Sequence, residues 1–219
     1  RNPNFSPAST AGLLKIIFLI CLFLSALTAN AIAVYVLPEP AGPIANSKSS
    51  IVDSIRILGI DPGLQVCGYA CVDTDGGQET VIEAGVLRTT HGLPLATRLD
   101  EIALDLEILL ERLMPHVVAV EEIYAHYAHP RTAILMGHAR GVILQKCARA
   151  HIEVKSFAAT RIKKSLTGHG RASKEQMQRT IQTILGLPQL PSPPDVADAM
   201  AAALCCANAL SRLGSKGKD

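Results

Sequence analysis

The chain has 219 residues, of which 48% are hydrophobic, and its formal net charge is +2. This length allows one domain with an appendage, and it excludes the two-domain actin-like and sugar-kinase-like ATPases, which need a much longer chain. The apolar content is ample for a core. The six cysteines form neither Cys-x-x-Cys pairs nor a His/Cys metal spacing, which excludes a disulfide framework and is typical of small core residues in a reducing compartment.

An apolar segment near the N-terminus has several interpretations. Residues 16–36 carry no charge and are long enough to span a bilayer. Lys15 before the segment, with the small residues Ala29-Asn-Ala31 inside it, also fits a signal peptide with a cleavage site. Because the chain begins with Arg1, spurious translation from upstream of the true start is a third interpretation.

A linker rich in proline, serine and glycine, residues 38–50, separates this segment from the rest of the chain. We therefore predict an N-terminal extension over residues 1–53, a folded domain over residues 54–213 and a flexible tail over residues 214–219. We expect a cytoplasmic protein, unless the apolar segment is a genuine membrane or export signal.

The folded domain opens with three runs typical of strands. They are Arg56–Ile60, Val66–Asp73 and Glu79–Thr89, and the turns between them fall at Gly63 and Gly76-Gly77. This pattern predicts a three-stranded meander.

A helical pattern follows over Pro94–Leu113, where apolar residues recur at helical spacing until Pro115 stops the helix. The short, β-branched run Val117–Val120 suits a buried parallel strand. A helix over Thr132–Ala150 and a strand over Glu153–Phe157 come next.

Two further helices are predicted over Ser173–Leu185 and Asp195–Leu213, with a proline-rich segment between them. The whole order describes an α/β fold, a mixed five-stranded sheet flanked by helices, with the middle helices as right-handed crossovers. It is similar to the order of the ribonuclease H-like fold. In that fold the first strand lies centrally beside the fourth.

Four acidic residues occupy the places where these elements end or begin. Asp61 follows the first strand directly, Glu121 follows Val117–Val120, and Asp195 and Asp198 are three apart on one face of the last helix. Carboxylates that converge from two strand ends and a helix start would form an oxygen-ligand site suited to Mg²⁺ or Mn²⁺. With basic segments nearby, the pattern indicates metal-dependent phosphodiester chemistry on nucleic acid.

Each acid also has a simpler structural interpretation. Asp61 precedes Pro-Gly and could begin a turn, while Asp195 and Asp198 could be a helix cap and a first-turn acid that complements the helix dipole. Glu121 and Glu122, directly after a buried strand, have no such simple account. The four acids together, each at its own element, favour the functional interpretation.

The basic residues are concentrated in one part of the chain. Between positions 131 and 179, eleven lysines and arginines are opposed only by Glu153 and Glu175. Such a block could attract phosphate backbones in a salt-dependent way, or it could consist of solvated helix faces.

Several short motifs are spread through the folded domain. They are Ile60-Asp-Pro-Gly63, Gly68-Tyr69, Val120-Glu-Glu-Ile-Tyr124, Gly137-His-Ala-Arg-Gly141 and Asp195-Val-Ala-Asp-Ala199. In order and spacing these motifs resemble those of the RuvC family of Holliday junction resolvases. The similarity covers about residues 55 to 210 and does not reach the first fifty residues.

The resemblance implies a dimeric, magnesium-dependent endonuclease that nicks two opposing strands of a four-way DNA junction symmetrically and leaves ligatable 5′ phosphates. By position, Asp61, Glu121, Asp195 and Asp198 would be the catalytic and metal-binding acids. Two Mg²⁺ ions in each active site would activate a water and stabilise the departing 3′ oxygen, with Mn²⁺ as a possible substitute. RuvA and RuvB would be partners in branch migration.

The resemblance also implies DNA contacts. Tyr124 stands where the family often has a phenylalanine that stacks at the junction centre, and Lys163 and Lys174 match basic positions near DNA phosphates. Arg140 is either structural or phosphate-facing. The small residues around it would permit close helix packing, including across a dimer.

The chain departs from the family pattern in places. Glu122 stands where many members have glutamine; it would add to the metal-binding charge if it pointed into the site, but it is expected to face away. His126 and His129 fall in a loop that could contact DNA but is expected to face solvent. Two alternative functions remain open at this point. One is a related ribonuclease H-like nuclease on RNA or branched DNA, and the other is a junction-binding protein without catalysis, against which the intact acids argue.

Overall fold

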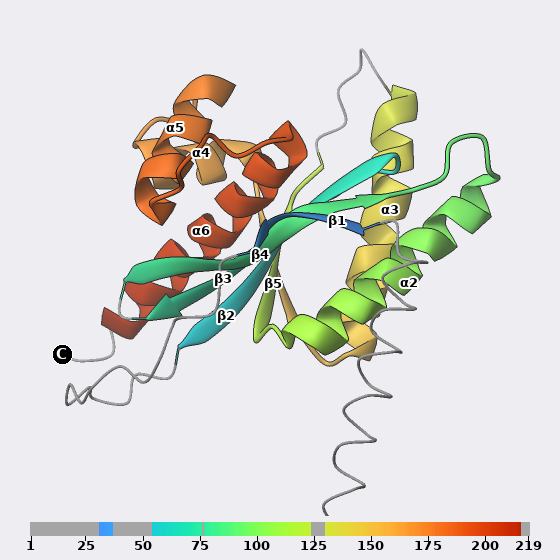
Figure 1. The fold of residues 1–219 in the computed structure, drawn as a ribbon, viewed down its shortest axis with the longest axis horizontal. Helices are drawn as coiled ribbons and strands as arrows, with labels where there is room; N and C mark the ends of the chain where they lie inside the picture. The colour runs from blue at the N-terminus through green and yellow to red at the C-terminus, as the bar shows by residue number, and fades with distance from the viewer. Residues whose placement is uncertain (1–30, 37–53, 76, 124–129, 216–219) are drawn as a thin grey trace, which may run out of the picture.

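The computed structural model describes residues 31–36, 54–75, 77–123 and 130–215. These residues form one mixed sheet with helices on both of its faces (Figure 1). The strands lie in the order β1-β4-β3-β2-β5-β6.

Five of these strands match the predicted ones, with small differences at their ends. They are β2 (Ile55–Asp61), β3 (Val66–Asp75), β4 (Gln78–Arg88), β5 (Val117–Glu121) and β6 (Glu153–Phe157). Antiparallel pairing joins β2 to β3 and β3 to β4, whereas β5 runs parallel to both β2 and β6. The first predicted strand is therefore central and beside the fourth, and the mixed α/β sheet of the ribonuclease H-like order is confirmed.

A sixth strand was not predicted. β1 (Ala31–Val36) comes from the N-terminal extension and pairs antiparallel with β4, with Ala31 opposite Leu87 and Val36 opposite Glu83. Apolar and β-branched residues suit a sheet edge as well as a bilayer, so the sequence pattern did not distinguish the two. Among the described residues no helix is long and apolar enough to cross a membrane, and residues 1–30 and 37–53 lie outside them.

Five helices cover the two faces of this sheet. They are α2 (Leu95–Leu113), α3 (Pro130–Arg149), α4 (Ala159–Thr167), α5 (Lys174–Leu185) and α6 (Pro194–Ser215). The pair α2 and α3 lies on one face, while α6 lies on the other with α4 and α5 packed against it (Figure 1). The helix α4 was not predicted, because it is nine residues long and Ile162 is its one fully buried residue.

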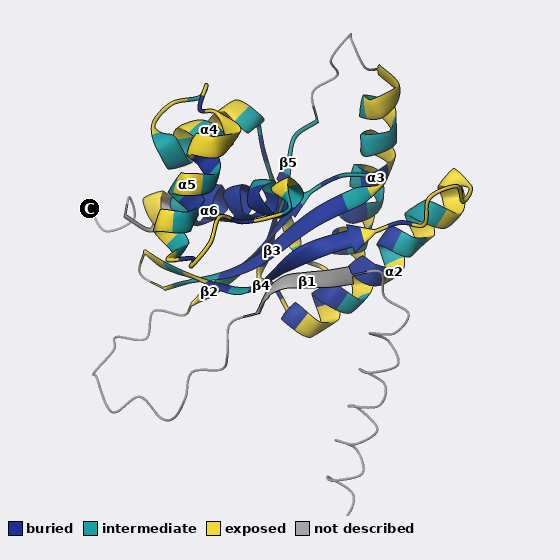
Figure 2. Cartoon of the chain, turned by 45° about the horizontal axis from the view of Figure 1, so that its top comes forward, coloured by how far each residue is buried: buried dark blue, intermediate teal, exposed yellow. Residues whose placement is uncertain are grey.

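The strand side chains alternate between two apolar cores. Ile57 of β2 and Val117 of β5 belong to the core under α6, while Leu58 and Val118, their neighbours in sequence, belong to the core under α2 and α3. Figure 2 shows the central strands and α6 as the most completely buried elements. All five cysteines in the described part of the chain are buried and unpaired, as their pattern predicted.

A partly buried ion pair holds α2 on the sheet. The Tyr69 hydroxyl donates to Glu83 Oε1 at 2.8 Å, and Arg112 of α2 pairs with both oxygens of Glu83, with Nη2 at 2.8 Å from Oε1. Although burial opposes it, hydrogen bonding from Arg112 and Tyr69 leaves the pKa of Glu83 below its usual value. The charge of Glu83, whose side chain is 9% exposed, is therefore compensated by its partners on β3 and α2.

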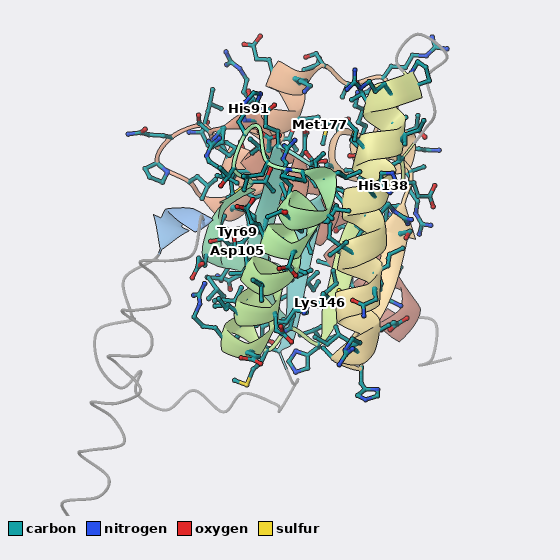
Figure 3. All side chains as sticks on the ribbon, turned by 90° about the vertical axis from the view of Figure 1, so that its right-hand side faces the viewer. Tyr69, His91, Asp105, His138, Lys146 and Met177 are labelled. Carbon is teal, nitrogen blue, oxygen red and sulfur yellow. The ribbon has the colours of Figure 1, made fainter. Side chains whose placement is uncertain are left out.

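Asp105 of α2 is a buried acid without such partners. Its side chain, labelled in Figure 3, makes no hydrogen bond or ion pair with the described residues. Burial, with the charge of Glu101, raises the pKa of Asp105 to about 6. The ordinary pKa of 3.8 applies to the unfolded chain, so the carboxyl group loses its proton more readily when the protein is unfolded. Ionised Asp105 therefore lowers the free energy of unfolding above about pH 6, and this effect disappears as the pH falls towards 3.8.

We expect Asp105→Asn to raise the free energy of unfolding by roughly 1–2 kcal/mol at pH 7 and to change it little at pH 4. Urea unfolding at the two pH values measures this difference. Asp100→Asn, at an exposed position of the same helix, is the control and should have no effect at either pH. Equal stability of Asp105→Asn and the unaltered chain at pH 7 would contradict the expectation.

Candidate active site

Two neighbouring strands end in acids at the same edge of the sheet. Asp61 is the last residue of β2 and Glu121 the last of β5, and the parallel register that sets Ile60 beside Val120 places the two acids level. Since residues two apart share a face, both acids belong to the face covered by α6. Asp61 pairs with Gly68 of β3, so it is a strand residue and not a turn residue.

The start of α6 brings the other two acids to this edge. α6 begins at Pro194, a favoured first helical residue, so Asp195 lies inside the first turn and not at the cap position. A Cβ built on Gly68, the partner of Asp61, would come within 2.0 Å of the backbone oxygen of Asp195. The first turn of α6 therefore sits directly against β3, beside Asp61.

The four carboxylates interact electrostatically. Burial, and then the charges of Asp198, Glu121 and Asp195, raise the pKa of Asp61 to about 7. Burial and the charge of Asp198 raise the pKa of Glu121, and burial likewise raises the pKa of Asp198, with Asp195 adding to the rise. The acids predicted from three separate parts of the sequence thus lie within range of one another.

Two lysines oppose this negative charge. Lys174 Nζ lies 3.8 Å from Asp198 Oδ2, and Lys174 and Lys163 both lower the pKa values of Asp198 and Glu121 against the effect of burial. Lys163 comes from α4 and Lys174 begins α5, so the helix that was not predicted carries one of the two cations. Both predicted DNA-binding lysines are therefore beside the acids.

The donor set fits a divalent cation of the Mg²⁺ type. As the side chains stand, no three His, Cys, Asp or Glu side chains in the described part of the chain form a group that could hold one metal ion. The four acids supply only carboxylate oxygens, the ligands that hard cations prefer. A cation among them would also relieve the repulsion that, together with burial, raises the pKa of Asp61.

Arg140 and Glu122 lie on the other face of the sheet from the four acids. Arg140 Nη2 donates to Ser156 Oγ at 2.8 Å, which ties α3 to β6, while its Nε is buried with no hydrogen-bond partner in the structure. Of the two alternatives for Arg140, the structural contact is the one present. Glu122 follows Glu121 and points to a hollow of about 370 Å³ beside α3, away from the acids. The hollow is lined by Glu122, Ile123, Gly137, Arg140, Gly141 and Leu144.

Tyr124, His126 and His129 lie outside the described residues, so their predicted roles are not addressed by the structure. Sequence reasoning also missed how closely α6 approaches Gly59 and Gly68. A signal was available, because glycine inside a strand often marks the close approach of another backbone.

Sequence comparison identifies the family that this site belongs to. A model of the family described as "Crossover junction endodeoxyribonuclease RuvC" matches residues 57–206. A protein of that name from Rhodopirellula baltica is 46% identical over 149 residues, which cover 68% of this chain and 84% of the relative. A second, from Heliobacterium modesticaldum, is 41% identical over 155 residues, covering 71% of this chain and 95% of the relative.

Solved structures show the same fold. T. thermophilus RuvC in complex with a Holliday junction substrate superposes with a TM-score of 0.68 at 31% identity, covering 74% of this chain and 97% of that one. The yeast mitochondrial Holliday junction resolvase Ydc2 superposes with a TM-score of 0.57 at 16% identity, covering 77% of this chain and 84% of that one, a likeness of fold alone.

Proposed function

The chain belongs to the RuvC family of crossover junction endodeoxyribonucleases, and from this membership we propose that Asp61, Glu121, Asp195 and Asp198 form its active site with two divalent metal ions. The protein is a Holliday junction resolvase, an endonuclease of recombination and repair, and its family is generally metal-dependent. The observation that carries the proposal is the meeting of these acids with Lys163 and Lys174 at one edge of the sheet.

Each group in this site has a distinct task. Bound Mg²⁺, with Mn²⁺ as a substitute, would lower the pKa of the attacking water and supply positive charge to the phosphorane and the departing 3′ oxygen. The four carboxylates would hold the ions at fixed positions. Lys163 and Lys174 would attract the scissile phosphate, since carboxylates alone would repel it. The products would carry 5′ phosphates.

The test is cleavage of a mobile four-way junction and of matching linear duplex by the full chain, with and without Mg²⁺. The proposal predicts paired, symmetric nicks that are confined to the junction, require the metal and can be sealed by ligase. Junction binding without cleavage under any divalent metal would overturn it. Cleavage of linear DNA or RNA instead would indicate a related nuclease with another substrate.

The lysines should control how tightly the junction is bound. We expect Lys163→Ala and Lys174→Ala each to weaken binding and to reduce the slope of log affinity against log salt by about 1, the value for one lost phosphate contact. Fluorescence anisotropy in Ca²⁺ or without metal measures this slope. Arg179→Ala is the control on α5, because Arg179 is engaged with Glu175 at 2.8 Å; an equal loss there would show a diffuse charge effect.

We also propose that the chain works as a dimer that contacts itself through α3. On this helix Ile134 is 62% exposed, and Gly137 and Gly141, one turn apart, have open space where side chains would stand. These glycines border the hollow that contains Arg140 with its unpartnered Nε. A second helix could pack closely there, and a dimer would present two active sites to two strands of the junction.

If α3 forms the dimer contact, Gly141→Glu should convert the dimer to a monomer, because a charged side chain would fill the close-packed helix contact. Light scattering with size-exclusion chromatography measures the mass. Thr132→Glu adds the same charge at an exposed position of α3 that lies nine residues from Gly141 and therefore on the opposite side of the helix, and it should remain dimeric. A dimer in both variants would place the contact elsewhere.

By family resemblance, the branch-migration proteins RuvA and RuvB are proposed as partners. We also propose that the protein acts on chromosomal DNA in the cytoplasm. Co-sedimentation of the chain with RuvA and RuvB on a four-way junction tests the first of these. Failure to join such a complex at any concentration would contradict it.

A further inference from the structure

The face of the sheet beneath α6 changes in side-chain size along the strands. The level nearest the active site holds one glycine and two acids, the next holds a glycine and two alanines, and the third holds larger β-branched residues. Across β3, β2 and β5 these levels are Gly68, Asp61 and Glu121, then Ala70, Gly59 and Ala119, then Val72, Ile57 and Val117.

Two glycines of this face lie directly under the backbone of α6. A Cβ on Gly68 would come within 2.0 Å of the Asp195 oxygen, and a Cβ on Gly59 within 2.1 Å of the Ala199 oxygen. Neither glycine has a positive φ, so each is required for its missing side chain and not for an unusual backbone conformation. At these two points the helix rests on the strands with no space for even a methyl group.

The two contacts differ in what they hold. Gly68 is the register partner of Asp61 and supports the turn that carries Asp195. Gly59 supports the helix further along, at Ala199 and Ala203, above a level of the sheet that contains only small apolar side chains.

We propose that Gly68 is a positioning residue for cleavage. Because Gly68 has no side chain, the first turn of α6 packs directly against the backbone of β3. This close packing fixes the distance from Asp195 and Asp198 to Asp61. The inference rests on the proposed function of the four acids, since it concerns how they reach the metal ions. Gly59, by comparison, supports α6 at Ala199 and Ala203, one turn past Asp195, so we expect a smaller influence on the position of the acids.

Gly68→Ala and Gly59→Ala form a matched pair, because each adds one methyl group against a backbone oxygen of the same helix at almost the same distance. Both should lose thermal stability, and both should bind junction DNA normally without divalent metal. Only Gly68→Ala should lose about 100-fold in cleavage rate, the cost of a displacement near 1 Å at a reacting centre. Its requirement for Mg²⁺ should rise about tenfold, a size typical when metal ligands lose their support.

Three results would overturn the proposal. They are full cleavage by Gly68→Ala at the normal Mg²⁺ concentration, an equal loss of cleavage in Gly59→Ala, and failure of Gly68→Ala alone to fold. If neither variant folds, Asp195→Glu tests whether the distance from residue 195 to Asp61 is fixed, because it lengthens the carboxylate side chain and keeps Gly68. If the first turn of α6 is held in place, the added methylene displaces the carboxylate, and the cleavage rate should fall at least about tenfold. Normal cleavage would show that the distance is not fixed.

If Gly68→Ala folds, the double variant Gly68→Ala, Asp195→Glu is an independent test of the coupling between these two positions. A longer carboxylate should recover part of the reach lost when the helix start moves away, so the double variant should cleave faster than Gly68→Ala. A rate equal to the product of the two single losses would contradict this coupling. Asp61→Asn distinguishes the proposed role of the four acids from the positioning role of Gly68. Cleavage that survives in Asp61→Asn would overturn the role of the acids themselves.

Discussion

Asp61→Asn is expected to abolish junction cleavage and to leave junction binding intact. The carboxylate stands at the carboxyl end of the central strand, where burial and three neighbouring acids raise the pKa of Asp61 to about 7. The amide keeps the size of the side chain and removes the charge that would hold the metal ions, so we expect a loss of at least about 10³-fold in single-turnover rate.

Glu122→Gln is the matched control for this experiment. It makes the same chemical change at an acid that faces the hollow beside α3. We expect normal cleavage from it, and an equal loss in the two variants would show that charge near the strand end matters without a specific metal site. Weaker binding of Asp61→Asn in metal-free buffer would indicate a misfolded site.

Arg112→Met is expected to produce a large loss of stability away from the active site. It leaves Glu83 charged beneath α2 with only the Tyr69 hydroxyl as partner. Breaking a buried pair costs about 3–5 kcal/mol, and because the Arg112 side chain is 35% exposed we expect a smaller loss of about 2–3 kcal/mol. The melting temperature should fall by roughly 5–10 °C for a domain of this size.

Two comparisons identify the cause of that loss. Adding Glu83→Gln to Arg112→Met should restore part of the stability, because the uncompensated charge is removed. Arg179→Met breaks an exposed pair with Glu175 and should change the free energy of unfolding by less than about 0.5 kcal/mol. Equal losses for Arg112→Met and Arg179→Met would show that the burial of Glu83 has no energetic consequence.

The central strands and the four acids could be predicted from the sequence, since the buried strands are short β-branched runs that end at acids. The adjacency of Asp61 and Glu121 came from the expected topology, and the parallel pairing of β2 with β5 confirms it. Local patterns did not reveal α4, which is too short for a clear helical period, or the edge strand β1, whose residues would also suit a membrane.

Other features could not be predicted because they depend on contacts between distant parts of the chain. The pairing of Glu83 with Arg112 joins residues 29 apart, on a strand and a helix, whose charges would each suit an exposed surface. The glycine inside β3 could have indicated the close approach of another backbone, but no local pattern shows that the first turn of α6 is the segment that contacts Gly68.

The most direct test of the active site is anomalous diffraction from crystals of the full chain soaked in Mn²⁺. Two anomalous peaks, each coordinated by carboxylates from among Asp61, Glu121, Asp195 and Asp198, are the predicted result. Peaks held by other residues, or none at the carboxyl ends of β2 and β5, would contradict the assignment of these acids as the metal site.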